Sequence, residues 1–235
     1  MPPFDVIAFD ADDTLWHNER IYAGVQASFA RLLSPYHPKE VVEARLYQTE
    51  TRNIKSFGYG IKSFTLSMIE TAVELTEGTI SSKEIQAIID LGKGMLGAEV
   101  ELLEHTDGTI AQLAASYRLM VITKGDLQDQ QTKIARSGLG QYFQYIEVVN
   151  DKTRDIYSQL LRKLSIQPER FLMVGDSLRS DILPILELGG QAVYIPYQIT
   201  WLHESAEIPP QDTPGFHQIE NLGRLPGLLE QLAAG

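Results

Sequence analysis

Three aspartates, Asp10, Asp12 and Asp13, follow directly after the short apolar segment 5–9. A segment of this kind is typical of a buried strand in a parallel sheet, and ligands bind just beyond the carboxyl ends of such strands. Carboxylates that crowd together raise one another's pKa values. A hard divalent cation would relieve this repulsion, and Mg2+ typically takes one or two carboxylates together with water and phosphate oxygens. The pattern therefore indicates a magnesium site; an acidic loop that caps the next helix is the alternative.

Polar residues also follow three further predicted strands, 119–122, 146–149 and 171–174. These residues are Thr123, Lys124 and Gly125 after the first, Asn150, Asp151 and Lys152 after the second, and Gly175, Asp176, Ser177 and then Asp181 after the third. Taken alone, a lysine such as Lys152 is most simply a solvated surface residue, and an aspartate near a helix start is most simply a cap. Together, in this order and each at a strand end, they indicate an active site.

This set of residues resembles the motifs of the haloacid dehalogenase superfamily of hydrolases, and the resemblance covers nearly the whole chain. The segment Asp10-Ala11-Asp12-Asp13-Thr14 is similar to the first motif, Thr123 matches the Ser/Thr of the second, Lys152 matches the lysine of the third, and the segment 175–181 resembles the acidic fourth motif. Two positions differ from many relatives: Asp13 stands where glycine is common, and Lys124 stands where asparagine is common.

The resemblance implies phosphoryl chemistry at the acidic residues. Asp10 would attack phosphorus and form an aspartyl-phosphate, while Asp12 would protonate the leaving oxygen and then act as a base on water. Mg2+ would be bound by Asp10, Asp176 and the main-chain carbonyl of Asp12. Asp181 is expected to orient a metal-bound water or Lys152.

The remaining matched residues are implied to bind the phosphoryl group. Thr123 and the main-chain amide of Lys124 or Gly125 would hold its oxygens, and Lys152 would neutralise charge on it and on the nucleophile. The side chain of Lys124 either favours a more anionic substrate or points to solvent. Asp13 is given no catalytic role, because a turn or capping residue suffices there.

The elements that must position these residues fall into two patterns. Helical periodicity fills about ninety residues after Leu15, with a capping box from Ser81 to Glu84. From about Leu102 onward, helix and strand signals alternate, which is typical of a parallel sheet covered by helices on both faces. We expect an α/β fold with a doubly wound, Rossmann-like parallel sheet from residues 1–15 and 102–235. Residues 16–101 have the position and size of the family's helical cap.

Composition restricts the class of protein further. The 235 residues carry a formal net charge of −11, which argues against nucleic-acid binding, and they include no cysteine, which excludes thiolate nucleophiles and disulfides. The N-terminal residues lack the features of a signal peptide, and no apolar run is long enough for a membrane span. We therefore expect a cytoplasmic protein that does not bind a membrane. It could form a homo-oligomer through exposed helices of the cap.

The function predicted from the sequence is a Mg2+-dependent phosphatase that hydrolyses a small phosphorylated metabolite through a phospho-Asp10 intermediate. Asp12 favours this over dehalogenation, because a halide leaves without a proton. A phosphomutase shares the same motifs, and a catalytically silent binding module on the same fold is the alternative from a different class. The substrate stays open among sugar phosphates, nucleoside monophosphates and phosphoglycolate-like acids.

Overall fold

The computed structural model describes residues 3–199, 201 and 204–234. The chain folds into two compact units. The α/β unit comprises Met1–Glu19, Val100–Lys124 and Thr132–Gly235, and the helical unit comprises Arg20–Glu99 and Gly125–Gln131.

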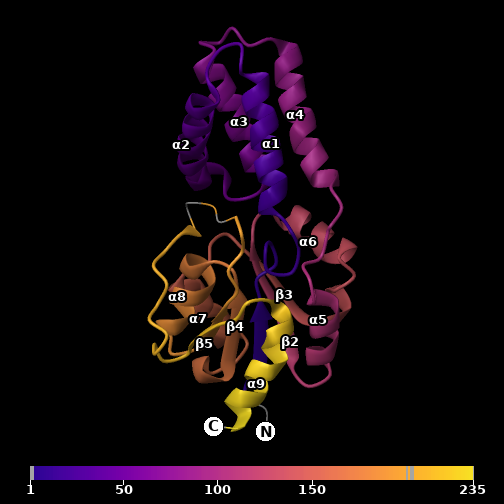
Figure 1. Cartoon of the computed structure of the whole chain (residues 1–235), viewed down its shortest axis with the longest axis vertical. Helices are drawn as coiled ribbons and strands as arrows, with labels where there is room; N and C mark the ends of the chain where they lie inside the picture. Colours follow the sequence, from indigo (N-terminus) through magenta and orange to yellow (C-terminus); the bar gives the residue numbers. More distant parts are fainter. Residues whose placement is uncertain (1–2, 200, 202–203, 235) are drawn as a thin grey trace. The chain divides into compact units, whose positions relative to one another are not determined.

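A parallel six-stranded sheet organises the α/β unit, with the strand order β3-β2-β1-β4-β5-β6 (Figure 1). The strands are β1 (Val6–Phe9), β2 (Arg118–Lys124), β3 (Phe143–Val149), β4 (Phe171–Gly175), β5 (Gln191–Tyr194) and β6 (Phe216–Gln218). Phe9 of β1 lies in register with Val121 of β2 and Val174 of β4. Because the strand order reverses at β1, the ends of β1 and β4 form the switch point at which open parallel sheets bind ligands.

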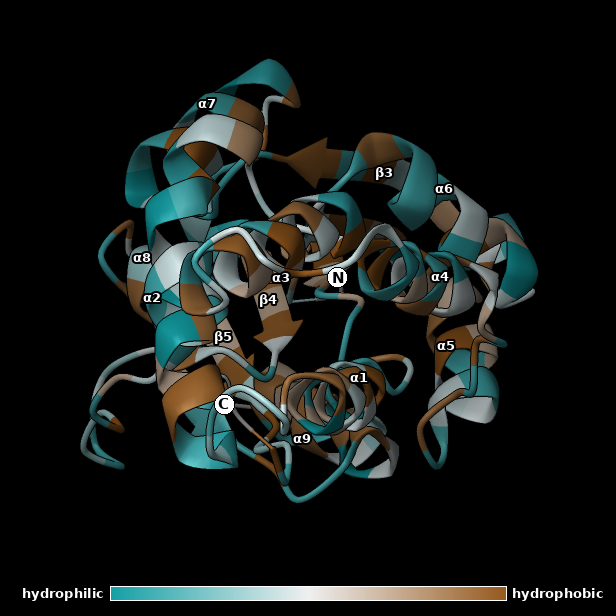
Figure 2. Ribbon diagram, turned by 90° about the horizontal axis from the view of Figure 1, so that it is seen from above, coloured by the Kyte–Doolittle hydropathy of each residue, from teal (hydrophilic) through white to brown (hydrophobic). Residues whose placement is uncertain are grey.

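The central strands β1, β2 and β4 are buried on both faces of the sheet, so they read as largely continuous apolar runs. Ile7 and Phe9 of β1 pack in one cluster with residues of α5 (Thr106–Ala114) and α9 (Leu225–Ala234). The alternate residues Val6 and Ala8 pack on the other face with α7 (Arg154–Lys163) and α8 (Leu183–Leu186). In Figure 2 the strands are largely brown, whereas α7 combines teal and brown residues, as an amphipathic covering helix should.

Four long helices form most of the helical unit: α1 (Glu19–Leu32), α2 (Lys39–Phe57), α3 (Ile61–Leu75) and α4 (Ser82–Gly97). They enclose a separate core in which Phe29, Leu46 and Met68 are fully buried. The capping box predicted at Ser81 and Glu84 is confirmed at the start of α4. Within this unit, an ion pair of 3.0 Å joins Lys62 to Asp126, in the segment just before α6 (Leu127–Arg136).

The predicted fold class is confirmed, and three local elements differ from the expectation. The alternating helix and strand signals predict a helix near 181–188, and the structure has there a π-helical turn, η3 (Leu178–Ile182), followed by the single turn α8. Strand β6 and helix α9 at the C-terminal end were not predicted from the sequence. Among the described residues, no helix combines the length and the apolar character that a membrane span requires.

Candidate active site

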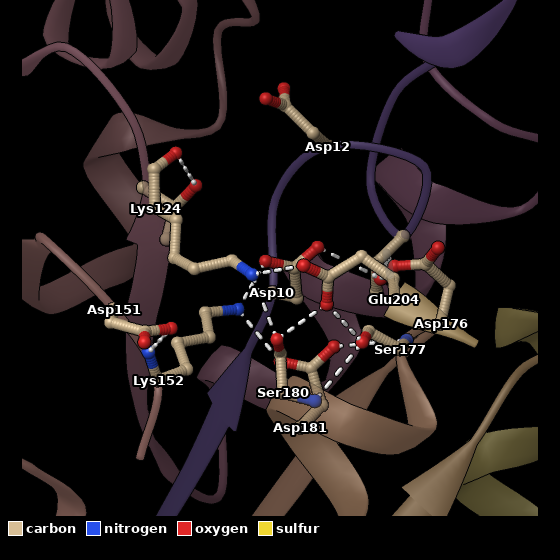
Figure 3. Close-up of polar contacts among 12 residues, drawn as sticks. Asp10, Asp12, Lys124, Asp151, Lys152, Asp176, Ser177, Ser180, Asp181 and Glu204 are labelled. Carbon is tan, nitrogen blue, oxygen red and sulfur yellow. Dashed lines mark hydrogen bonds and ion pairs between the residues drawn. The ribbon is translucent and has the colours of Figure 1, made fainter. Parts of the chain in front are cut away.

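The residues singled out in the sequence lie at the carboxyl end of the sheet. Asp10 follows β1 directly, Thr123 is the penultimate residue of β2, Asp176 follows β4 directly, and Lys152 comes three residues after β3. Their side chains and those of their neighbours form one network of polar contacts (Figure 3). The strands therefore bring Asp10 and Asp176, which lie 166 positions apart in the sequence, into one site.

A buried ammonium group links two of the carboxylates. The Nζ of Lys152 donates to Asp10 and, over 2.7 Å, to Oδ1 of Asp181. Burial alone would lower the pKa of Lys152, but the charges of Asp10 and Asp181 raise it well above its ordinary value. The other oxygen of Asp181 accepts the main-chain N–H of Ser177 over 3.1 Å. Asp181 thus has both oxygens engaged, and it fixes Lys152 against Asp10.

The cluster is suited to a divalent cation. Oxygens of Asp10, Asp176 and Asp181 all lie within 4.8 Å of one another, and the hydroxyl of Thr14 lies 3.3 Å from both Asp10 and Asp176. Burial raises the pKa of Asp10 to about 7 against the effect of Lys152, and burial with the charge of Asp10 raises the pKa of Asp176 well above its ordinary value. Three ionised carboxylates beside one ammonium would leave an excess of negative charge, which a divalent cation would offset, and hard oxygen donors of this kind fit Mg2+.

The carboxylate of Asp12 lies apart from this cluster (Figure 3). Its oxygens accept from Nζ of Lys133 over 2.8 and 2.9 Å and from the indole N–H of Trp16 over 2.7 Å. Lys133, which was not predicted from the sequence, also donates to the side chain of Asn18. The structure therefore separates the two aspartates of the first motif: Asp10 faces Lys152, and Asp12 faces Lys133.

Asp13 was expected to be a turn residue or a capping residue, and its hydrogen bonds are those of a capping residue. Its carboxylate accepts the main-chain N–H of Asn18 over 2.8 Å and of Glu19 over 3.0 Å, at the start of α1. Its φ of 64° is left-handed, a conformation that glycine adopts freely and that aspartate tolerates better than most residues. Burial raises its pKa to about 7, opposed by the hydrogen bond from Asn18.

Thr123 and Gly125 flank Lys124 at the end of β2. Thr123 is buried, and its hydroxyl donates only a long 3.4 Å bond to the carbonyl of Lys124. Gly125 has a φ of 136°, which an L-residue rarely adopts. The backbone thus turns sharply directly after β2.

The side chain of Lys124 binds an acid that sequence reasoning missed. Its Nζ lies 2.5 Å from Oε1 of Glu204 and 2.8 Å from Oγ of Ser180. The other oxygen of Glu204 accepts from Ser177 over 2.6 Å and from Ser180 over 2.5 Å. Glu204 lies in a loop without periodicity, 80 residues after Lys124, so no local pattern pointed to it. Of the two alternatives for the side chain of Lys124, the one in which it points to solvent is contradicted, because the side chain is only 14% exposed.

The sheet, its switch point and the acidic cluster define a hydrolase of the haloacid dehalogenase-like type. Residues 4–189 match the family model of the haloacid dehalogenase-like hydrolases, and the chain belongs to this family. The predicted resemblance is confirmed, and so is the expectation that the chain is a hydrolase.

The chain is similar to known proteins both in structure and in sequence. A haloacid dehalogenase-like family hydrolase from Xanthomonas campestris has a crystal structure similar to this one, with a TM-score of 0.88 and 39% identity over 99% of this chain and 93% of that chain. The N-acylneuraminate-9-phosphatase of Homo sapiens is 25% identical over 96% of this chain and 94% of its own. The 5-amino-6-(5-phospho-D-ribitylamino)uracil phosphatase of Escherichia coli (strain K12) is 24% identical over 80% of this chain and 82% of its own.

Proposed function

We propose that this protein is a Mg2+-dependent phosphatase that hydrolyses a small phosphomonoester through an aspartyl-phosphate on Asp10. The observation that carries the proposal is the buried contact of Lys152 with both Asp10 and Asp181, beside Asp176 at the carboxyl end of the sheet. Relatives named as phosphatases over most of this chain support the same reaction class. The expectation of a cytoplasmic location stays a prediction.

The roles of the two catalytic aspartates follow from their different surroundings. Asp10 attacks phosphorus as a carboxylate, and the ammonium of Lys152 favours that charged form. Asp12 gives a proton to the leaving oxygen and takes one from the water that cleaves the intermediate. In-line displacement places the leaving oxygen opposite the nucleophile, so an acid set apart from Asp10, as Asp12 is, suits this role (Figure 3).

The phosphoryl group would be held by residues around the end of β2 and by Lys152. The hydroxyl of Thr123 is buried and weakly bonded, so it is available to donate to a phosphoryl oxygen. The main-chain amide of Lys124 or Gly125 is the second donor in this proposal. The side chain of Lys124 is already engaged by Glu204, so the proposal assigns substrate binding to its amide.

Asp10, Asp176 and the main-chain carbonyl of Asp12 would hold Mg2+. When bound, the ion offsets the charge of the carboxylates and of the phosphoryl oxygens. Asp181 acts in this proposal by positioning Lys152, because both of its oxygens already accept hydrogen bonds from the protein.

The test is phosphate release from a panel of sugar phosphates, nucleoside monophosphates and phosphorylated acids, with and without Mg2+. We expect metal-dependent release by the wild type and a loss of at least about 1,000-fold in Asp10→Asn, because the nucleophile is removed. Asp155→Asn is the matched control, since Asp155 is 84% exposed on α7, and it should retain full activity.

Three outcomes would contradict the proposal. Release that persists in Asp10→Asn, with deamidation and contamination excluded, would remove Asp10 as the nucleophile. Transfer of the phosphoryl group between positions of a sugar without net release would identify a phosphomutase. Binding of phosphorylated ligands by the wild type with no turnover across the panel would identify a silent binding module.

A further inference from the structure

Lys124 and Glu204 form an ion pair that the proposed mechanism does not use. Their charged atoms lie 2.5 Å apart, and the two side chains are only 14% and 15% exposed. Burial alone would raise the pKa of Glu204, but Lys124 and the hydroxyls of Ser177 and Ser180 lower it to about 2. The carboxylate of Glu204 is therefore ionised at neutral pH, and both of its oxygens accept hydrogen bonds.

Lys124 and both serines that contact Glu204 are sequence neighbours of proposed site residues. Lys124 follows Thr123, Ser177 follows Asp176, and Ser180 precedes Asp181. Figure 3 shows Glu204 reaching Lys124, Ser177 and Ser180 from its own loop. Removing the charge of Lys124 or of Glu204 would change the electrostatic attraction for any anion bound at this end of the sheet, because partly buried charges are poorly screened.

The donors around Glu204 form an anion-binding set. Lys124 contributes an ammonium group, and Ser177 and Ser180 each contribute a hydroxyl. An ammonium and two hydroxyls would suit a carboxylate or phosphate of a ligand equally well. Glu204 occupies all three donors, so Lys124 adds no net charge to the site.

We propose that Glu204 is a specificity-determining residue that neutralises Lys124 and so disfavours phosphomonoesters with a second anionic group close to phosphorus. This inference rests on the proposed function, because it concerns the substrate of that site. Specificity of this kind comes from an element that disfavours the wrong ligand, here a carboxylate of the protein in the place that a ligand carboxylate would take. Without the carboxylate of Glu204, the same donors would accept such a ligand.

The experiment compares two phosphonates that cannot be hydrolysed as esters and that differ in one group. In 3-phosphonopropionate, two methylene groups separate the carboxylate from the phosphorus atom. In 3-hydroxypropylphosphonate, a neutral CH2OH group takes the place of the carboxylate. Dissociation constants are measured by calorimetry with Mg2+ present. The wild type should bind 3-hydroxypropylphosphonate at least as tightly as 3-phosphonopropionate. In Glu204→Gln the binding of 3-phosphonopropionate should tighten about 10-fold relative to the alcohol, the value of one charge-assisted hydrogen bond.

Two further variants separate this effect from general electrostatics. Glu207→Gln removes the same charge from an exposed position of the same loop, and it should leave the ratio of the two dissociation constants unchanged. Lys124→Met keeps the carboxylate of Glu204 but removes its cation. It should weaken the binding of 3-phosphonopropionate more than that of the alcohol, and it tests the inference even where Glu204→Gln fails to fold.

An unchanged ratio in Glu204→Gln with native stability would overturn the inference and leave Glu204 with a structural role. An equal change for both ligands would do the same. Both readouts are binding constants, so a failure of the proposed function appears separately, as absent phosphate release from the ester panel.

Discussion

The Nζ of Lys152 and the Oδ1 of Asp181 form an ion pair of 2.7 Å in which both side chains are only 1% exposed. The same ammonium contacts Asp10, so the position of Asp181 determines where the lysine meets the proposed nucleophile. Asp181 is itself held by the N–H of Ser177 and lies in the π-helical turn η3. Single π-helical turns occur often at functional sites.

Gly175 should be required because the carboxylate of Asp181 packs against its Cα. A Cβ at Gly175 would lie 2.3 Å from Oδ2 and 2.4 Å from Cγ of Asp181. Gly175→Ala should therefore displace Asp181 and, through it, Lys152. We expect phosphatase activity to fall about 100-fold, since a misplacement of about 1 Å has that effect, with a stability loss of about 1–3 kcal/mol.

The control for this prediction is Gly94→Ala in α4, where a Cβ would meet nothing within 4 Å. It should retain activity, and its stability should rise slightly because alanine is the better helix former. Steady-state phosphate release and urea unfolding measure both effects. Wild-type activity in Gly175→Ala would show that the close approach of Asp181 is not needed.

Removal of the Lys152 ammonium should destabilise the protein strongly. Lys152→Met would leave Asp10 and Asp181 buried without their cation, and breaking a buried pair in this way costs about 3–5 kcal/mol. The measurement is the free energy of unfolding in urea without Mg2+. Lys163→Met is the matched control, because Lys163 is 65% exposed in its pair with Glu147, and exposed pairs contribute about 1 kcal/mol or less. Equal losses in the two variants would contradict the prediction.

The sequence was sufficient to predict the strands that position the site. Each central strand is a continuous apolar run buried on both faces, and polar residues begin where the run ends, as at Asp10 and Asp176. Strand β6 has three residues, too few for any periodicity to appear. Helix α9 was not predicted because adjacent proline and glycine, here Pro226 and Gly227, are typical of a turn or loop. Proline is nevertheless tolerated in the first turn of a helix, where Pro226 lies.

The contacts of the site side chains could be predicted only where they follow from the order of the strands. Neighbouring parallel strands bring their ends together, so the proximity of Asp10 and Asp176 could be predicted from the sequence. The partners Lys133 and Glu204 come from a helix face and from an irregular loop. Their contacts depend on the three-dimensional path of the chain and leave no local spacing in the sequence.

Substitutions of Asp13 should separate its cap from its backbone conformation. Asp13→Asn should be close to wild type, since asparagine caps helices and tolerates positive φ. Asp13→Gly keeps the conformation and loses the cap. Asp13→Ala loses both, at about 1 kcal/mol for the cap and 1–2 kcal/mol for the left-handed φ of 64°. Urea unfolding should therefore show stability falling from Asp13→Asn through Asp13→Gly to Asp13→Ala. An alanine variant as stable as the asparagine variant would contradict both proposed roles of Asp13.

Glu50 in α2 should make stability depend on pH. Burial raises its pKa from 4.5 to about 8, and none of the described side chains forms an ion pair with it. Between these two values the folded protein holds a proton that the unfolded chain releases, so the contribution of Glu50 to stability falls as pH rises through this range. Glu50→Gln keeps the neutral form at every pH, and it should therefore gain stability over the wild type progressively from pH 5.5 to 7.5, with a slope of at most about 1.4 kcal/mol per pH unit.

The measurement is the difference in unfolding free energy between Glu50→Gln and the wild type at pH 5.5, 6.5 and 7.5. Taking the difference removes the contributions of Asp10 and Asp13, whose pKa values are also raised by burial. Glu43→Gln on the same helix is the control, because Glu43 is 43% exposed beside Lys39 and should give a difference that does not change with pH. A Glu50→Gln difference that is equally flat would mean that Glu50 is ionised in the folded protein throughout this range.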